Sequence, residues 1–143
     1  MVYISVSAYS QTISDQTFSD DFPLFSLIQA IDDKKVPDDF QRLNRYIFSK
    51  NTTFGTASLY FDDEVYIGSI GAAFETTNEA IDYNAQFYNY LEKNGSYVKS
   101  TADGEDIYFF ENVYIKIIKV LKRNDGLIIA GIRISGDINE FDY

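Results

Sequence analysis

The run over residues 113–135, VYIKIIKVLKRNDGLIIAGIRIS, is the longest apolar stretch of the chain and constrains its fold most strongly. Two segments rich in Ile and Val flank Asn124-Asp125-Gly126, a set of residues that favours turn geometry. Gly126 can take positive φ at little cost, as the bulge of a three-residue loop requires. The run therefore predicts two antiparallel strands that form a large part of the core.

The alternation of side chains predicts the register of this hairpin. A three-residue loop places Val120 opposite Ala130 and Ile118 opposite Ile132, on one apolar face. A two-residue turn would instead set Lys119 opposite Ile132, because a slip of one residue moves every side chain to the other face. The second face then carries the remaining residues, Ile115, Ile117, Lys119, Leu121, Ile129, Arg133 and Ser135.

This second face is half apolar and basic, so the core alone does not explain it. We expect either that N-terminal helices cover it, or that a second copy or a partner does. Solvent exposure of Leu121 and Ile129 in a monomer would favour the second copy or the partner.

The main helix is predicted over 76–94. Thr76 and Glu79 form a capping-box pattern, and Gly95 suits the end of the helix. The apolar arc exceeds half a turn, which is wider than a surface helix needs. Asn84 lies near the middle of that arc, so we predict a buried polar side chain that requires a partner.

Two short N-terminal helices are predicted before it. The first begins at Asp20-Asp21-Phe22-Pro23 and ends before Pro37, because Pro suits a first helical turn and disfavours continuation. The second begins at Pro37-Asp38-Asp39. Its buried side is predicted from helical spacing to consist of Phe40, Leu43 and Ile47.

Alternating residues predict further strands. We expect a half-buried strand over 2–9, a hairpin over 56–61 and 64–70, and another over 97–101 and 107–110. The chain is thus predicted to be one α+β domain over 1–143, an antiparallel sheet packed against the main helix (76–94) with two short N-terminal helices. The acidic C-terminal tail, about 136–143, is expected to be frayed or to form an edge.

Composition limits the possible chemistry. The 143 residues include no Cys and no His, which excludes disulfides, thiolate nucleophiles, imidazole bases and nearly all zinc sites. No apolar run approaches the roughly 20 residues that span a membrane. No signal peptide is visible, so we expect a cytoplasmic protein, or a secreted or periplasmic one if Met1 is not the natural start.

Acidic doublets are the most frequent polar motif. They could supply paired carboxylates for glycoside hydrolysis or for a divalent metal. Most of them precede helices or lie in turns, and none has the spacing of a calcium loop. We therefore predict neither an enzyme nor a cofactor or metal site.

Net charge is −10, with 22 acidic and 12 basic residues. Such a chain repels nucleic acid and anionic lipid and is attracted to basic proteins. We predict a non-enzymatic acidic protein that inhibits or sequesters a basic partner, such as a nucleic-acid-handling enzyme, as immunity proteins and anti-defence inhibitors do. The alternative function is a small extracytoplasmic module that binds a ligand or a protein; among partners, a second copy of the chain in a homodimer is also considered. The candidate partner-binding residues are Asp20, Asp21, Asp32, Asp33, Asp38, Asp39, Asp62, Asp63, Tyr83 and Tyr90.

Overall fold

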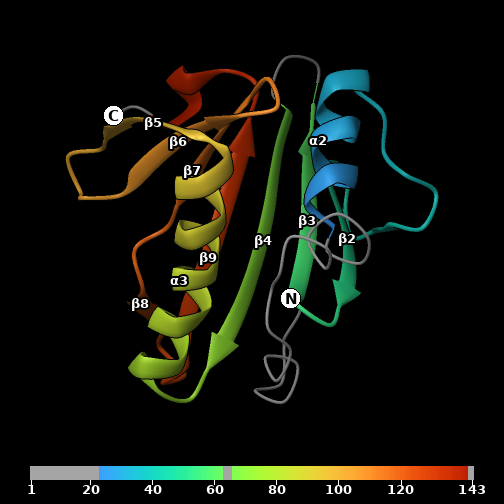
Figure 1. The fold of residues 1–143 in the computed structure, drawn as a ribbon. Coiled ribbons are helices and arrows are strands. Elements are labelled where there is room, and N and C mark those ends of the chain that lie inside the picture. The colour runs from blue at the N-terminus through green and yellow to red at the C-terminus, as the bar shows by residue number, and fades with distance from the viewer. Residues whose placement is uncertain (1–22, 63–65, 142–143) are drawn as a thin grey trace.

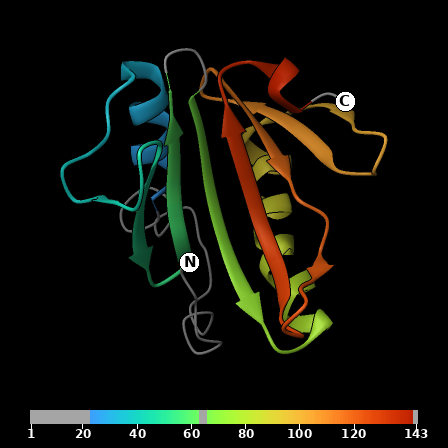
Figure 2. The same cartoon turned by 180° about the vertical axis from the view of Figure 1, so that it is seen from behind.

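The computed structural model of the chain describes residues 23–62 and 66–141. Within these residues, nine strands form one antiparallel sheet, and two helices pack on the same face of it (Figure 1). Figure 2, seen from behind, shows the other face of the sheet in front of both helices. The predicted α+β class is therefore confirmed.

The elements follow one another in a simple order. They are α2 (Leu24–Asp33), β1 (Gln41–Arg42), β2 (Ile47–Thr52), β3 (Gly55–Phe61), β4 (Tyr66–Phe74), α3 (Thr77–Asn94), β5 (Ser96–Ser100), β6 (Asp106–Phe110), β7 (Val113–Ile117), β8 (Leu121–Lys122), β9 (Ile128–Ser135) and the 3-10 helix η2 (Ile138–Phe141).

Two meanders meet at the centre of the sheet. The strand order is β1-β2-β3-β4-β9-β7-β6-β5, with β8 pairing to β9 beyond the end of β7. Strands β4 and β9 pair from Ile67 opposite Ser135 to Phe74 opposite Ile128. The last strand of each meander thus forms the longest pairing of the sheet.

The core lies between this central pair and the two helices. Ile70 of β4 and Ile132 of β9 are almost completely buried beneath Leu27 of α2 and Phe87 of α3. The fit is close at Gly68, because a Cβ there would lie 3.3 Å from the end of the Ile31 side chain in α2. Both helices therefore pack on side chains from the same face of β4 and β9.

The main helix begins as predicted. The Thr76 hydroxyl accepts a hydrogen bond from the Glu79 N–H at 3.2 Å and donates to the Glu79 carboxylate at 2.9 Å. This reciprocal contact satisfies a backbone donor that a helix start leaves open. The Gly95 N–H donates to the Leu91 carbonyl at the other end.

The prediction of two short N-terminal helices is wrong. Only α2 forms among the described residues, and 37–47 makes a turn followed by β1 and the start of β2. The Asn44 side chain accepts hydrogen bonds from the Tyr46 and Ile47 N–H groups, at 2.9 and 3.0 Å. An Asn that bonds to the backbone ahead of it favours a turn over a helix, and so it reverses the chain here.

The three-residue loop of the 113–135 hairpin is confirmed. The Arg123 N–H donates to the Leu127 carbonyl at 2.7 Å, and Gly126 has φ 89°. Near the loop the register is the predicted one, with Leu121 opposite Ile129. The predicted hairpins of β3 with β4 and of β5 with β6 also form, whereas the strand predicted over 2–9 lies outside the described residues.

Farther from the loop the register shifts by one residue. Ile117, not Ile118, lies opposite Ile132. Ile115 and Ile117, predicted on the second face, are therefore buried in the core, and Ile118 is only half-buried. The cause is an irregular segment over 118–120, which absorbs one extra residue in this strand.

The N-terminal helix does not cover the second face, because α2 packs on the same face as α3 (Figure 1). Leu121 is 66% exposed and Ile129 is half-buried. Phe141 of η2 is buried and lies with its ring 5.4 Å from the Lys116 ammonium. The tail is therefore not frayed over 138–141, since it covers part of β7.

Replacement of Gly131 tests the close approach of β4 and β9. A Cβ at this residue would lie 2.1 Å from the Ile70 carbonyl oxygen, and φ is 147°. We expect Gly131→Ala to lower the free energy of unfolding by more than about 3 kcal/mol. The matched control is Gly104→Ala, which has φ 86° and open space around the Cβ, and should cost only about 1–2 kcal/mol. Urea denaturation of both variants measures this, and equal losses would contradict it.

Candidate functional site

The predicted partner-binding acids that the structure describes lie at several places. Asp33 and Asp38 line one shallow hollow beside the end of α2, and Asp32 lines another. Asp39 forms an exposed ion pair with Lys50. The remaining acids are Asp62, which accepts a hydrogen bond from the Tyr60 hydroxyl, and Asp20, Asp21 and Asp63, which lie outside the described residues.

The two predicted tyrosines lie about two turns apart on the same side of α3, and they differ in burial. Tyr83 is 1% exposed, and its hydroxyl donates to the Phe54 carbonyl. Tyr90 is half-buried, and its ring meets that of Phe110 edge-on at 5.6 Å. Tyr83 therefore packs in the core, as most residues of an apolar helix arc do.

Asp32 shares its hollow with two carboxylates that the sequence did not single out, Asp137 and Glu140. We call this the acidic hollow. Its volume is about 400 Å³, and it lies between the end of α2, the start of β4 and the segment that joins β9 to η2. The full lining is Ile31, Asp32, Lys34, Tyr66, Asn112, Ser135, Gly136, Asp137 and Glu140.

Local backbone contacts hold these side chains in place. Lys34 ends α2 in the left-handed conformation, with φ 53°. The Asp137 carboxylate accepts a hydrogen bond from the Asn139 N–H at 2.9 Å. The backbone carbonyl of Asp137 accepts one from the Glu140 N–H at 3.1 Å. Asp137 therefore shapes the turn that carries Glu140 toward the hollow.

The charges of the acidic hollow are not balanced locally. The Lys34 ammonium lies 5.4 Å from the centre of the Tyr66 ring, and forms no ion pair with a described carboxylate. The last turn of α2 contains no basic residue, although Asp32 and Asp33 lie there. Because the C-terminal end of a helix carries partial negative charge, these acids oppose the helix dipole.

The hollow is not arranged for a metal ion. In the described ranges, 23–62 and 66–141, no three acidic side chains have the spacing to hold one. Separated carboxylates around an open hollow suit an extended organic cation, which can bond to several of them at once.

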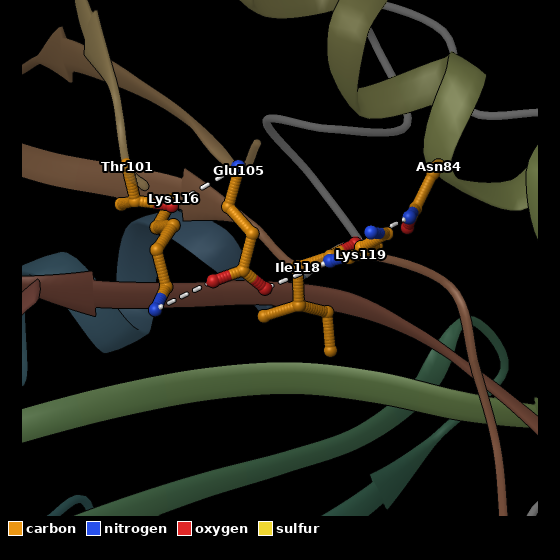
Figure 3. Close-up of polar contacts among 6 residues, drawn as sticks. All are labelled: Asn84, Thr101, Glu105, Lys116, Ile118 and Lys119. Carbon is orange, nitrogen blue, oxygen red and sulfur yellow. Dashed lines mark hydrogen bonds and ion pairs between the residues drawn. The ribbon is translucent and has the colours of Figure 1, made fainter. Parts of the chain in front are cut away.

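A buried polar network lies at the other half of the molecule, where α3 crosses β7 and β9 (Figure 3). The Asn84 side chain accepts the Gly131 N–H at 2.8 Å and donates to the Ile118 carbonyl at 2.9 Å. It replaces one of the two hydrogen bonds that Ile118 and Gly131 would exchange. The other remains, from the Ile118 N–H to the Gly131 carbonyl at 3.0 Å. The prediction that Asn84 is buried and needs a partner is confirmed.

Glu105 ends the pairing of β6 with β7 in the same region (Figure 3). Its carboxylate accepts the Lys119 N–H at 2.9 Å and pairs with the Lys116 ammonium at 3.1 Å. Its own N–H donates to the Thr101 hydroxyl at 3.1 Å. The Glu105 side chain thus bonds to the Lys119 N–H, which a residue of a neighbouring strand would otherwise bond to.

Two tyrosines between α3 and β6 have altered acidity. Burial raises the pKa of Tyr88 well above its ordinary value of 10.0, and the hydrogen bond to Asp106 adds to this. Burial and a hydrogen bond to Glu92 raise the pKa of Tyr108 in the same way. Both phenols therefore stay protonated in the folded chain at a pH where an unfolded chain would ionise them.

Comparisons with protein-family models, with curated proteins and with solved structures give no match for this chain. Neither α2 nor α3 is long and apolar enough to cross a membrane. Function must therefore be inferred from the chain's own surfaces.

Removal of the Asn84 amide tests its structural role. Asn84→Ala leaves the Gly131 N–H and the Ile118 carbonyl without this partner, so we expect the free energy of unfolding to fall by about 2–4 kcal/mol. The control is Asn89→Ala, an exposed residue of the same helix, which should change it by less than about 0.5 kcal/mol. Urea denaturation checks both, and a loss below about 1 kcal/mol at Asn84 would contradict the role.

Stability at alkaline pH tests the two shifted phenols. The unfolded chain ionises them near pH 10.0 and the folded chain does not, so their contribution is complete below that pH and is lost as pH rises above it. The loss of unfolding free energy between about pH 9 and pH 11 should be smaller in Tyr88→Phe/Tyr108→Phe. Urea denaturation across that range measures it, and an unchanged slope would contradict the shifts.

Proposed function

We propose that this chain is a non-enzymatic binding protein that inhibits or sequesters a basic protein partner. In this proposal the acidic hollow receives an arginine or lysine side chain of that partner. The observation that carries it is the placement of Asp32, Asp137 and Glu140 around one hollow, without a described basic residue paired to them.

The cost of this arrangement to the isolated chain supports a role in binding. Asp32 opposes the dipole of α2. A cation from a partner would remove this unfavourable term and pair with carboxylates that line the same hollow. A guanidinium group fits best, because its donors can bond to more than one carboxylate.

The charge of the whole chain supports the same class of partner. A net charge of −10 attracts a basic protein over a distance and speeds the encounter. A nucleic-acid-handling enzyme has such a basic surface, and a protein seated on that surface would exclude the nucleic acid. This would be inhibition of the kind that immunity proteins and anti-defence inhibitors exert, and it needs no catalysis.

Neutralisation of the hollow tests the proposal. The partner is captured from native lysate with the wild-type chain, identified and purified, and its affinity is measured by calorimetry at low and at high salt. Asp32→Asn/Glu140→Gln should weaken binding at least about tenfold, and the remaining affinity should depend less on salt. The melting temperature should stay equal or rise, because Asp32 no longer opposes the helix dipole.

The matched control is Asp103→Asn/Glu75→Gln, which makes the same change in charge at exposed residues outside the acidic hollow. It should weaken binding only slightly, and this small loss should shrink at high salt. A partner that is not basic, or equal losses in the two double variants, would overturn the proposal.

A further inference from the structure

One edge of the sheet is incomplete beside β8. The pairing of β6 with β7 runs from Phe110 opposite Val113 to Ile107 opposite Lys116. Beyond it the chain continues through 118–122, which pairs with β9 on one side. On the other side no described strand pairs with this segment.

The outer edge of the segment offers backbone hydrogen-bonding groups. The Arg123 N–H donates to Leu127, so the alternation of an antiparallel strand directs Leu121 and Arg123 toward β9. Val120 and Lys122 then direct their N–H and C=O groups away from β9. Glu105 already occupies the outward N–H of Lys119, which leaves room for a strand beside Val120 and Lys122.

The same edge borders an apolar groove. The groove has a volume of about 270 Å³ and lies between the flank of α3 and the irregular segment 118–120. Ile81 and Ala85 lie one helical turn apart on that flank, and Ile81 is 50% exposed. In Figures 1 and 2, β8 lies beside the N-terminal half of α3. The full lining is Ile81, Asn84, Ala85, Tyr88, Gly104, Ile117, Ile118, Lys119 and Val120.

We propose that an extended segment of a partner protein adds to this edge as a strand beside β8. Its backbone bonds to Val120 and Lys122, and one apolar side chain enters the groove between Ile81 and Ala85. The next side chain lies on the opposite face of the sheet beside Leu121, which is 66% exposed. Strand addition of this kind derives affinity from the backbone and specificity from the pocket.

Charge selects the composition of that segment. Lys119 and Lys122 are exposed and form no ion pair with a described carboxylate. A segment with Asp or Glu next to its apolar residues would pair with them. A second copy of the chain suits the edge less well, because pairing through β8 would bring the same lysines together, along with two net charges of −10.

This interface is separate from the acidic hollow, and it does not depend on the function proposed above. None of the residues that line the groove lines the hollow. A partner could use both surfaces, or different partners could use one each.

Selection from a displayed library of random peptides, about ten residues long, tests the proposal, since this length covers one strand with its flanks. The full chain is the bait. Enriched peptides should share apolar residues that alternate with acidic or polar ones. A synthetic copy of the best peptide should lose at least about tenfold in affinity when alternate backbone nitrogens are methylated, since methylation removes the ladder donors.

Two variants locate the binding. Lys122→Pro removes an outward N–H and no bond to β9, and Ala85→Phe fills the groove; each should weaken the peptide at least about tenfold with the circular dichroism spectrum unchanged. The control Lys122→Ala keeps the N–H, so its loss should be limited to that of one exposed charge pair, about threefold.

Several outcomes would overturn the proposal. One is a selection that yields no enriched peptide, which would mean that the edge does not accept a strand. Another is a set of peptides that bind Ala85→Phe and Lys122→Pro as tightly as the wild type. A concentration-dependent dimer in light scattering that Lys122→Pro dissociates would identify a second copy as the occupant instead.

Discussion

The bridge that Asn84 makes between β7 and β9 is the interaction on which the second half of the molecule depends. Through Asn84, α3 hydrogen-bonds directly to the backbone of Gly131 in β9 and of Ile118, the residue that follows β7. This contact ties α3 to the place where the pairing of β7 with β9 ends. The irregular segment 118–120, the half-buried Ile118 and the groove beside α3 all lie there.

The local parts of the fold could be predicted from the sequence because short-range rules determine them. Thr76 with Glu79, Gly126 in its loop and the buried Asn84 all follow from capping, turn geometry and periodicity. The helix predicted from Pro37 does not form, although Phe40, Leu43 and Ile47 have helical spacing. The Asn44 side chain bonds to the backbone ahead of it and favours a turn. The register predicted for β7 was wrong because the irregular segment 118–120 absorbs one extra residue, and no regular alternation along the strand indicates it.

The candidate sites likewise combine features that the sequence predicts with others that only the fold creates. The sequence indicates Asp32 as one of an acidic doublet, but Asp137 and Glu140, which line the same hollow, come from the opposite end of the chain. No pattern along the sequence brings them together, since only the pairing of β4 with β9 sets the β9–η2 connection beside α2. Conversely, Tyr83 is of a residue type that is common at interfaces, yet it lies in the core. The apolar arc of α3 is wide enough to include it.

The central pairing of β4 with β9 has a consequence for how the chain folds. All the other pairings join strands that are close in sequence, so each meander can form by closing short loops. The β4–β9 contact joins the ends of the two meanders, which α3 and its flanking turns separate in the sequence. Such non-local closure is the slow step in β-rich proteins. Until it is complete, both central strands expose an open edge and an apolar face, and the net charge of −10 opposes association of chains in that state.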